Sequence, residues 1–550
     1  MAPAHADAPD ADAGRAGPGE TQPGGAGGSF VRAARTVAGL TVVSRVAGLA
    51  RDAICARIFG AGAVWSAFAL AFMLPNLFRR LFGEGALSAA LVPEYARLVR
   101  DDPALARRFA TAAMGATVVV LAIVALVGEV ILFALLRYTA LGESGGLALR
   151  LAMVMLPYLV LICAAAAGGG MLQTHDRFGP AAASPIILNL CIIGVATIWA
   201  WRLDRSLEAT AFAIAGAVLG AGMLQLAWTL IALRPHVRWS RTLEGADAPL
   251  GRMARRMGPV ILGLGALQLN TLLDGLIAGW PVLVGPTITL PGAGTVAYPL
   301  DESSNAVLFF AQRLYQFPLG VFGIALATAV FPALSRESDS LERFGATLRR
   351  GVRLTLFIGL PAAAGLIAVR ADLATAILEG GAFGEGDSSR VARVLLGYAP
   401  AIWAYALTHT LTRAFYALHD TRTPMRIALA TVCANVLLNL ALIWPLAEAG
   451  LAWSTSICAT GQAIALALLL SRRMGAPVFD ASTRAGVGRC LVATAVMSAV
   501  LLPASLGMLS TAGWSASVAA LAATVVVGAG VYLGVCALLK APELRWATER

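Results

Sequence analysis

Charged residues and histidines are scarce in this chain, and the motifs of several protein classes are missing. Asp, Glu, Lys and Arg make up 13% of the 550 residues, and only 5 histidines occur. Soluble domains carry about 25% charged residues, so a soluble globular fold is excluded. The 7 cysteines stand singly, without a CxxC pair, which argues against a disulfide framework or a zinc site. There is no GxxxxGK[ST] motif, which excludes ATP hydrolysis by a P-loop.

Long apolar runs dominate the sequence instead. Hydrophobic residues make up 58% of the chain, and the mean hydropathy is +0.75. Runs of about 20 residues, enough to cross a hydrocarbon core of roughly 30 Å, recur almost throughout and are separated by short polar joints. This pattern predicts an all-α polytopic membrane protein with about fourteen transmembrane helices.

The distribution of arginine predicts how these helices are oriented. If the N-terminus is cytoplasmic, the joints on that side hold 22 arginines and the opposite joints hold 6. This asymmetry fits the positive-inside rule and places both termini in the cytoplasm. Membrane topology therefore explains the net charge of +11 better than nucleic-acid binding does. We expect residues 1–29, rich in Ala, Gly, Pro and Asp, to form a disordered cytoplasmic tail.

The chain also contains an internal duplication. ALSAALVP at Ala86–Pro93 returns as ALATAVFP at Ala325–Pro332, and LQTHDRFGP ending at Pro180 returns as YALHDTRTP ending at Pro424. Two copies of six helices insert with the same orientation, and such lobes would face each other across a central cavity. The predicted divisions are an N-lobe over 30–240, a C-lobe over 241–475, and two added helices with a short cytoplasmic tail over 476–550.

Several charged side chains lie inside predicted spans, where each costs roughly 2.5 to 3.5 kcal/mol if it faces lipid. In SRVAGLARDAICARIFGAG, Arg45 and Asp52 fall about 20° apart around a helix, and Arg51 lies beside them. The other candidate substrate-binding residues, in the second and eighth spans, are Arg79, Arg80, Glu84 and Arg313. We expect these groups to face a wet central cavity that holds an anion such as the pyrophosphate of a lipid head group. The alternative is a structural role, with arginines near helix ends reaching to the interface.

The longer motifs are similar to those of a known family. They are SRVAGLARDAICARIFGAG, LPNLFRRLFGEGALSAALVP, FAQRLYQFPLGVFGIALATAVFPALS, GAFGEGDS and RAFYALHDTRTP. Together they resemble the signatures of the bacterial lipid II flippase family MurJ (MviN), of the MOP exporter superfamily. The resemblance runs from about Thr36 to Arg473 and is carried mainly by the first three motifs.

The resemblance implies a transporter, not an enzyme, that flips lipid II by alternating access. Lipid II, the undecaprenyl-pyrophosphate-linked peptidoglycan precursor, would move from the cytoplasmic to the periplasmic leaflet of the bacterial inner membrane. The family's functional residues correspond to Arg45, Arg51, Asp52, Arg79, Arg80 and Arg313. The helices after Arg484 would line a groove for the lipid tail, and the expected partners are lipid II and membrane lipids, with a monomer as the working unit. Ser66 and Gln312 stand where the family commonly has acids, which weakens any coupling role for these positions.

A second polar set lies in the C-lobe and is a candidate sodium site. It comprises Asp274, Asn435, Asn439 and Thr455. Carboxylate, amide and hydroxyl oxygens are ligands that a hard cation prefers, and some family members hold sodium at similar positions. Hydrogen bonding between helices is an equally weighted alternative. No other cofactor is expected; sodium or the membrane potential would drive transport.

Two other functions stay open at this point. One is a different MOP exporter, for a polyprenyl-linked oligosaccharide or a drug, although arginines suit an anionic substrate better than a cationic drug. The other, less favoured, is a membrane-embedded transferase acting on the same lipid. Such enzymes use clustered Asp or His for metal or base chemistry, and the histidines here are dispersed.

Overall fold

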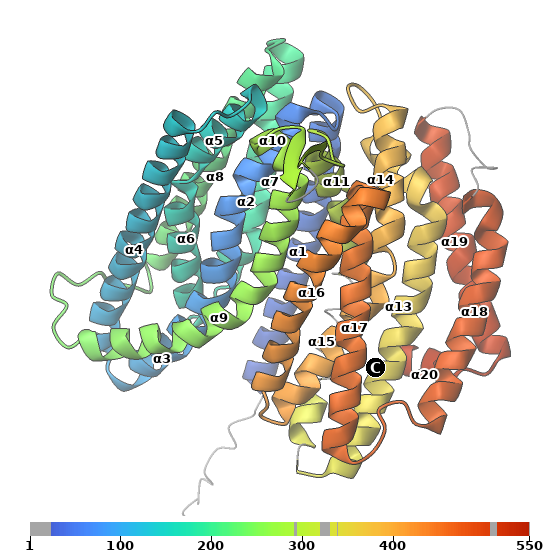
Figure 1. Ribbon diagram of the computed structural model, residues 1–550. Coiled ribbons are helices and arrows are strands. Elements are labelled where there is room, and N and C mark those ends of the chain that lie inside the picture. Colours follow the sequence, from blue (N-terminus) through green and yellow to red (C-terminus); the bar gives the residue numbers. More distant parts are fainter. Residues whose placement is uncertain (1–23, 291–293, 320–330, 338, 506–513, 549–550) are drawn as a thin grey trace, which may run out of the picture.

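The computed structural model describes residues 24–290, 294–319, 331–337, 339–505 and 514–548, with only the backbone for a few helical residues among them. Nearly all of this part is helical (Figure 1). In chain order the elements are α1 (Gly24–Phe59), α2 (Ala63–Phe78), η1 (Arg79–Ala86), α3 (Leu87–Asp101), α4 (Pro103–Tyr138), α5 (Glu143–Met155), α6 (Tyr158–Gln173), α7 (Gly179–Thr197), η2 (Ile198–Arg202), α8 (Leu207–Leu233), α9 (Asp247–Ala278), α10 (Trp280–Leu283), β1 (Thr287–Leu290), β2 (Gly294–Ala297), α11 (Ser304–Pro318), α13 (Leu341–Leu378), α14 (Glu385–Tyr398), α15 (Ala401–Ala417), α16 (Arg422–Leu446), α17 (Glu448–Met474), α18 (Ala481–Ser505), α19 (Trp514–Leu538) and α20 (Pro542–Thr548).

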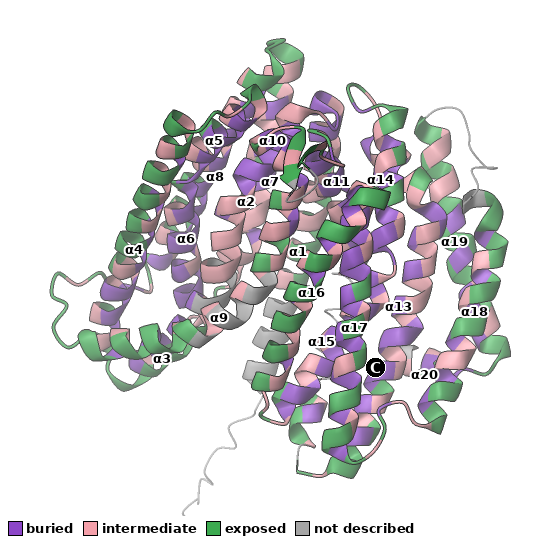
Figure 2. Cartoon of the chain, viewed as in Figure 1, coloured by how far each residue is buried: buried purple, intermediate pink, exposed green. Residues whose placement is uncertain are grey.

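Ten helical segments of the described part are long and apolar enough to cross a membrane. Their outer faces are apolar but exposed, as on α4 at Val119, Ile123 and Leu126 and on α19 at Val525 and Val526 (Figure 2). Exposed apolar faces of this extent need a lipid environment. A multi-pass membrane protein is therefore confirmed. Helix α1 begins at Gly24, inside the stretch for which the sequence suggests a tail, and residues 1–23 lie outside the described residues.

The helices repeat in the order that the sequence duplication predicts. Helices α5, α6, α7 and α8 begin at Glu143, Tyr158, Gly179 and Leu207, and α14, α15, α16 and α17 begin at Glu385, Ala401, Arg422 and Glu448. Each later start follows its counterpart by about 240 residues. The packing repeats as well, because α6 and α7 both contact α8, while α15 and α16 both contact α17.

A proline and a π-helix widen the second span at its middle. Pro75 lies inside α2 and removes one helical hydrogen bond. The chain then passes directly into η1, whose π turns are wider than α turns. Arg79 and Arg80 are the first two residues of η1, so both lie where the backbone departs from α-helical geometry.

The first and second halves of the chain meet at one end through the turns after α1 and α13. The amide of Ala382 donates to the carbonyl oxygen of Arg57 at 2.8 Å, and the amide of Ala61 donates to Asp387 Oδ2 at 3.4 Å. Gly381 has φ +58°, and a Cβ there would lie 2.3 Å from the Arg57 oxygen, so only glycine fits. Beside these turns the largest buried cluster joins residues of both halves.

The last three helices pack on α13, at the edge of the molecule away from α4 (Figure 1). Helix α13 contacts α18, α19 and α20. The hydroxyl of Tyr532 donates to the Phe357 oxygen at 2.7 Å, and Arg353 forms an ion pair with the buried Glu543 at 2.6 Å. The two added helices are therefore fixed to the second half.

The all-α prediction misses one β-hairpin. Strands β1 and β2 pair antiparallel with Thr287 opposite Ala297, in the joint that follows α10. Its Thr-Ile-Thr-Leu run alternates and contains β-branched residues, which favour strands. Tyr298 ties the hairpin down by donating to the Ile277 oxygen at 3.0 Å. Eight residues are too few to appear in a search for apolar spans.

Candidate functional site

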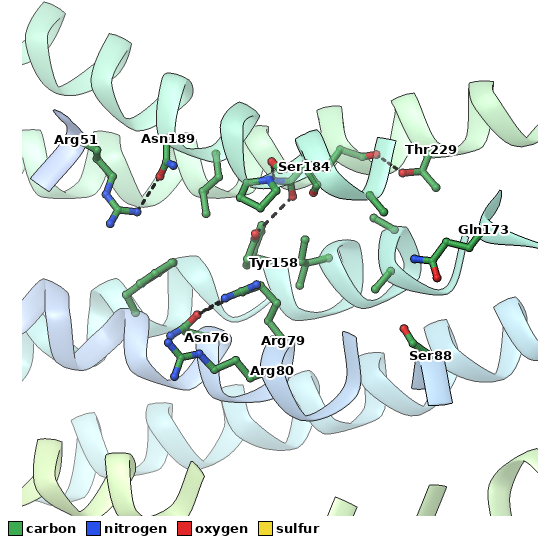
Figure 3. A pocket seen from close by; sticks show the side chains of 18 of the residues that line it. Arg51, Asn76, Arg79, Arg80, Ser88, Tyr158, Gln173, Ser184, Asn189 and Thr229 are labelled. Atoms are coloured by element: carbon green, nitrogen blue, oxygen red, sulfur yellow. Dashed lines mark hydrogen bonds between the residues drawn. The ribbon is translucent and has the colours of Figure 1, made fainter. Parts of the chain in front are cut away.

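A cavity of about 580 Å³ opens among the helices of the first half and α11. Its charged and polar lining residues are Arg51, Asn76, Arg79, Arg80, Ser88, Tyr158, Gln173, Ser184, Asn189, Gln225, Thr229 and Arg313. Four of these are arginines, and no acidic residue belongs to the lining given by the described residues. Figure 3 shows Arg51 with Asn189 on one wall and Arg79 and Arg80 beside Asn76 on the other.

The α1 wall is built around the pair Arg51 and Asp52. Arg51 donates to Asp52 Oδ1 from Nε at 2.9 Å and from Nη2 at 2.6 Å, and its Nη1 donates to Asn189 Oδ1 at 3.0 Å. Asn189 in turn donates to the Ser44 oxygen at 3.2 Å, which fixes α7 against α1. The guanidinium is thus held in one orientation, since both of its partners come from packed helices.

Helix α11 adds Arg313 from the second half of the chain. Its Nε lies 3.9 Å from Asp52 Oδ2, and its guanidinium lies over the Phe309 ring at 4.8 Å. Asp52 is almost fully buried, with 4% of its side chain exposed, and lies between two arginines. This group of three therefore keeps one excess positive charge beside the cavity.

The η1 wall carries Arg79 and Arg80. Arg79 donates to Asn76 Oδ1 from Nη2 at 3.0 Å and from Nε at 3.3 Å. The Asn76 amide is neutral and lies about one turn earlier, so this contact orients the guanidinium and adds no charge. Arg80 also lines a smaller space of about 80 Å³ between α2, α9 and α11, which shares Asn76 and Arg313 with the main cavity.

Three residues proposed from the sequence do not belong to the cavity lining given by the described residues; one of them, Asp52, lies behind it as the partner of Arg51 and Arg313. Arg45 is partly exposed on α1 and does not belong to the lining. Glu84 lies in η1, but its side chain lies outside the described part. Their part in substrate binding stays a prediction, whereas Arg51, Arg79, Arg80 and Arg313 do lie together.

The neutral lining residues were missed by sequence reasoning. Gln225 donates to the Ser184 oxygen at 2.7 Å, and Tyr158 donates to Gln225 Oε1 at 3.4 Å. Together with Asn189 they form a polar wall across α6, α7 and α8. The one indication in the sequence is that Asn189 and Gln225 each stand as a single amide residue within an apolar span.

The two positions that lack the usual family acids have distinct partners. Ser66 is buried; its Oγ accepts from the amide of Ala306 at 3.0 Å, and its carbonyl oxygen accepts from Asn305 at 3.0 Å. Gln312 donates to the hydroxyl of Tyr398 at 3.1 Å and lines the smaller space. Ser66 therefore satisfies a backbone donor at the start of α11, a role that needs no charge.

Three of the four residues in the polar set of the second half are joined by hydrogen bonds, together with two further residues. Asn439 donates to Asp274 Oδ1 at 2.6 Å and to Asn435 Oδ1 at 3.0 Å, and Ser454 donates to Asn439 Oδ1. Asn270 donates to Asp274 Oδ2 at 3.3 Å. Thr455 instead donates to a carbonyl of its own helix, that of Leu451, at 2.9 Å. Asn270 and Ser454 were not foreseen from the sequence.

Comparison with known proteins identifies relatives over most of the chain. A family model described as "Lipid II flippase MurJ" matches residues 55–536. The "Probable lipid II flippase MurJ" of Vibrio cholerae is 30% identical over 93% of this chain and 97% of that protein. The corresponding protein of Rhizobium tropici is 32% identical over 86% of this chain and 87% of that protein.

Solved structures are similar in fold. "Lipid II flippase MurJ, inward closed conformation" has a TM-score of 0.73 and 21% identity, and the match covers 92% of this chain and 98% of that one. A multidrug resistance MATE family transporter of the MOP superfamily, in an inward-facing conformation, has a TM-score of 0.57 and 15% identity, over 80% of this chain and 94% of that one.

Proposed function

The chain belongs to the lipid II flippase MurJ family, and from this premise we propose that it carries lipid II across the bacterial inner membrane. MurJ is a transporter rather than an enzyme, so the membrane-embedded transferase is set aside. The observation that carries the proposal is the gathering of Arg51, Arg79, Arg80 and Arg313 around one cavity, whose lining among the described residues contains no acid.

The cavity suits the head group of the substrate. Its volume of about 580 Å³ lies in the range of sites for small molecules, roughly 300 to 1,000 Å³. Guanidinium forks bind phosphate oxygens in pairs, so arginines on two walls suit both phosphates of a diphosphate. Asn76, Asn189 and Gln225 offer amides that can hydrogen-bond sugar hydroxyls. The undecaprenyl tail is far too large for this space, and we expect it to lie outside the cavity, along α18 and α19.

Alternating access needs contacts between the halves that form and break at opposite ends. At one end the turn after α1 contacts the turn after α13, through Arg57 and Ala382. At the other end α3 contacts α9. We propose that fourteen helices form two six-helix lobes and an added pair: the ten apolar spans plus the four charged or interrupted spans that begin with α1, α2, α9 and α11.

The proposed orientation places both termini in the cytoplasm. Helix α1 begins at the lower end of the view in Figure 1, and α20 lies toward the same end. The arginine-rich joints before α4, before α9 and after α17 follow the positive-inside rule if this end is cytoplasmic. The working unit is a monomer, because one chain supplies every wall of the cavity.

We also propose that the polar set around Asp274 holds sodium, with Asp274, Asn435, Asn439 and Asn270 as oxygen donors. Asp274 is buried, and its hydrogen-bond partners among the described residues are the amides of Asn270 and Asn439, with no cationic side chain. Asn270 Oδ1 is buried and has no hydrogen-bond partner among the described residues, so it suits a cation. A single carboxylate among neutral oxygens fits a monovalent ion. When bound, sodium would balance the negative charge of the Asp274 carboxylate.

A drug exporter is disfavoured by the charge of the cavity. Lining arginines repel the cations that many exported drugs carry, and an acid would be needed to bind them. Another polyprenyl-diphosphate-linked oligosaccharide shares the chemistry that the arginines recognise. It therefore competes with lipid II as a substrate and is compared with it directly in the test below.

The test is transport by purified protein in liposomes. Lipid II is placed in one leaflet, and its appearance in the other is followed with a reagent that does not cross the membrane. We expect transport by the wild type, loss in Arg51→Ala/Arg313→Ala, and retention in Arg137→Ala, an arginine at the end of α4 that does not line the cavity. Faster movement of a different prenyl-diphosphate glycan would reassign the substrate, and unimpaired transport by the double variant would refute the site.

A further inference from the structure

A second cluster of arginines lies outside the cavity, around one buried carboxylate. Glu94 on α3 exposes only 1% of its side chain. Its Oε1 accepts from Arg97 Nη2 at 2.7 Å and from Arg252 Nε and Nη2 at 2.9 and 2.7 Å. Arg256 Nη1 lies 3.7 Å from Oε2. We call these four residues the rim cluster.

The rim cluster has more positive charge than its own carboxylate can balance. Burial alone would raise the pKa of Glu94, but hydrogen bonds from Arg252 and Arg97 and their charges bring it below its usual value, so Glu94 is a carboxylate at neutral pH. Three guanidiniums against one carboxylate leave an excess of two positive charges. The arginine side chains are 43% to 55% exposed, so their remaining N–H groups face solvent.

The packing of α9 holds two of these arginines in place. Met253 is buried, and Leu250 and Met257 pack against the same apolar cluster, which includes residues of α3, α4 and α6. Arg252 and Arg256 are four residues apart, and therefore share one face of the helix. The start of α9 lies beside α3 in Figure 1. The arginines are thus carried by a rigid element rather than by a loop.

The rim cluster lies next to one end of the cavity. Ser88 lines the cavity, and Glu94 follows on the same helix, roughly 9 Å further along its axis. Tyr95, the next residue, contacts His175 Nε2 through its hydroxyl at 3.3 Å. His175 follows Gln173, another lining residue, by two positions. In the proposed orientation this end is cytoplasmic, the side on which lipid II is made available.

We propose that Arg97, Arg252 and Arg256 form a loading site for the diphosphate of the lipid substrate, which Glu94 occupies as an internal anion when no substrate is present. This inference rests on the proposed function and adds a site outside the central cavity. When Glu94 turns away, three guanidiniums face the ligand. A diphosphate diester, with one negative charge on each phosphate, pairs with two of them, whereas the single charge of a phosphodiester lipid such as phosphatidylglycerol pairs with one. Displacing Glu94 from Arg252 also loosens the contact between α3 and α9.

The experiment measures binding with the full chain in phosphatidylcholine nanodiscs. The background is Arg51→Ala/Arg313→Ala, so that binding at the central arginines is disabled. Lipid II is titrated alongside undecaprenol, which lacks phosphate, and phosphatidylglycerol. Arg252→Ala/Arg256→Ala should weaken lipid II binding about tenfold, and the matched control Arg255→Ala, on the same helix, by less than about twofold. Glu94→Gln should strengthen it, because the competing anion is removed.

The opposing outcomes are equally specific. Equal losses in Arg255→Ala and Arg252→Ala/Arg256→Ala, or equal affinity for phosphatidylglycerol, would reduce the rim cluster to a general positive surface and overturn the inference. A thermal unfolding midpoint measured for each variant separates lost binding from lost folding. The proposed function fails separately, if the wild type does not transport lipid II in the liposome assay, whatever the rim variants do.

Discussion

Replacing Arg51 by alanine tests the α1 wall of the cavity most sharply. The change removes two hydrogen bonds to Asp52 and one to Asn189. Among the described residues, Asp52 then keeps one cationic neighbour, Arg313, whose Nε lies 3.9 Å away. Breaking a buried pair costs about 3 to 5 kcal/mol. Because Arg51 keeps 12% of its side chain exposed and Arg313 remains nearby, we expect about 3 kcal/mol of lost stability.

In the proposed site, the same change also removes a charge-assisted contact with the substrate. Such a contact is worth about 1.5 to 3 kcal/mol, so the affinity for lipid II should fall about 10- to 150-fold. The two effects separate in Arg51→Ala/Asp52→Asn, where no unpaired carboxylate is left. This double variant should regain at least half of the lost stability and none of the lost affinity.

The assay pairs thermal unfolding with lipid II titration on the same nanodisc preparations. Arg137→Ala at the end of α4 is the control and should change neither quantity by more than about 0.5 kcal/mol. If the double variant binds lipid II as the wild type does, Arg51 serves only to pair with Asp52. In that case the reasoning about the α1 wall is refuted.

Three further results are expected. Gly381→Ala should lower the free energy of unfolding by more than the roughly 1 to 2 kcal/mol that a left-handed non-glycine residue costs, because the added Cβ would meet the Arg57 oxygen. Hydrogen exchange of the amides in the turn after α13 should become faster. Unchanged exchange would contradict the close contact. Asp274→Asn and Asn270→Ala should each weaken sodium-dependent stabilisation, measured as the shift of the unfolding midpoint with sodium against potassium; an unaltered shift would leave only interhelical hydrogen bonding. The pKa of Glu94 in the folded protein lies below its unfolded value of about 4.3, so the ionised group stabilises the fold above that pH, and this stabilisation is lost as the pH falls through the folded pKa. In Glu94→Gln the free energy of unfolding should therefore fall less steeply at acid pH. An unchanged acid dependence would contradict the ion pairs.

The sequence predicts best those parts of the molecule in which a charged residue lies within an apolar span. Arg51 and Arg313 stand out because a charge inside an apolar span needs a partner or water, and the structure brings both to Asp52. The order of the helices follows from the apolar runs and the duplication, since both are properties of the chain itself. The placement of Arg45 does not follow, because helical periodicity gives an angle around α1 and not the distance to a neighbouring helix.

The missed features are those that look ordinary in one dimension. Asn189 and Asn270 are single neutral residues in apolar helices, and only the neighbour across the interface reveals their roles. Glu94 lies in a polar joint, where a charge is normally solvated; its burial depends on α9, far away in the sequence. The hairpin β1–β2 is short and lies between spans, so a search for transmembrane periodicity passes over it.

The most direct measurement is a structure of this chain with lipid II bound, determined by electron cryomicroscopy. We expect the diphosphate inside the cavity, with phosphate oxygens within hydrogen-bond distance of Arg51, Arg313 and at least one of Arg79 and Arg80. A diphosphate bound away from all four of these arginines, with the cavity holding only sugar or solvent, would contradict it.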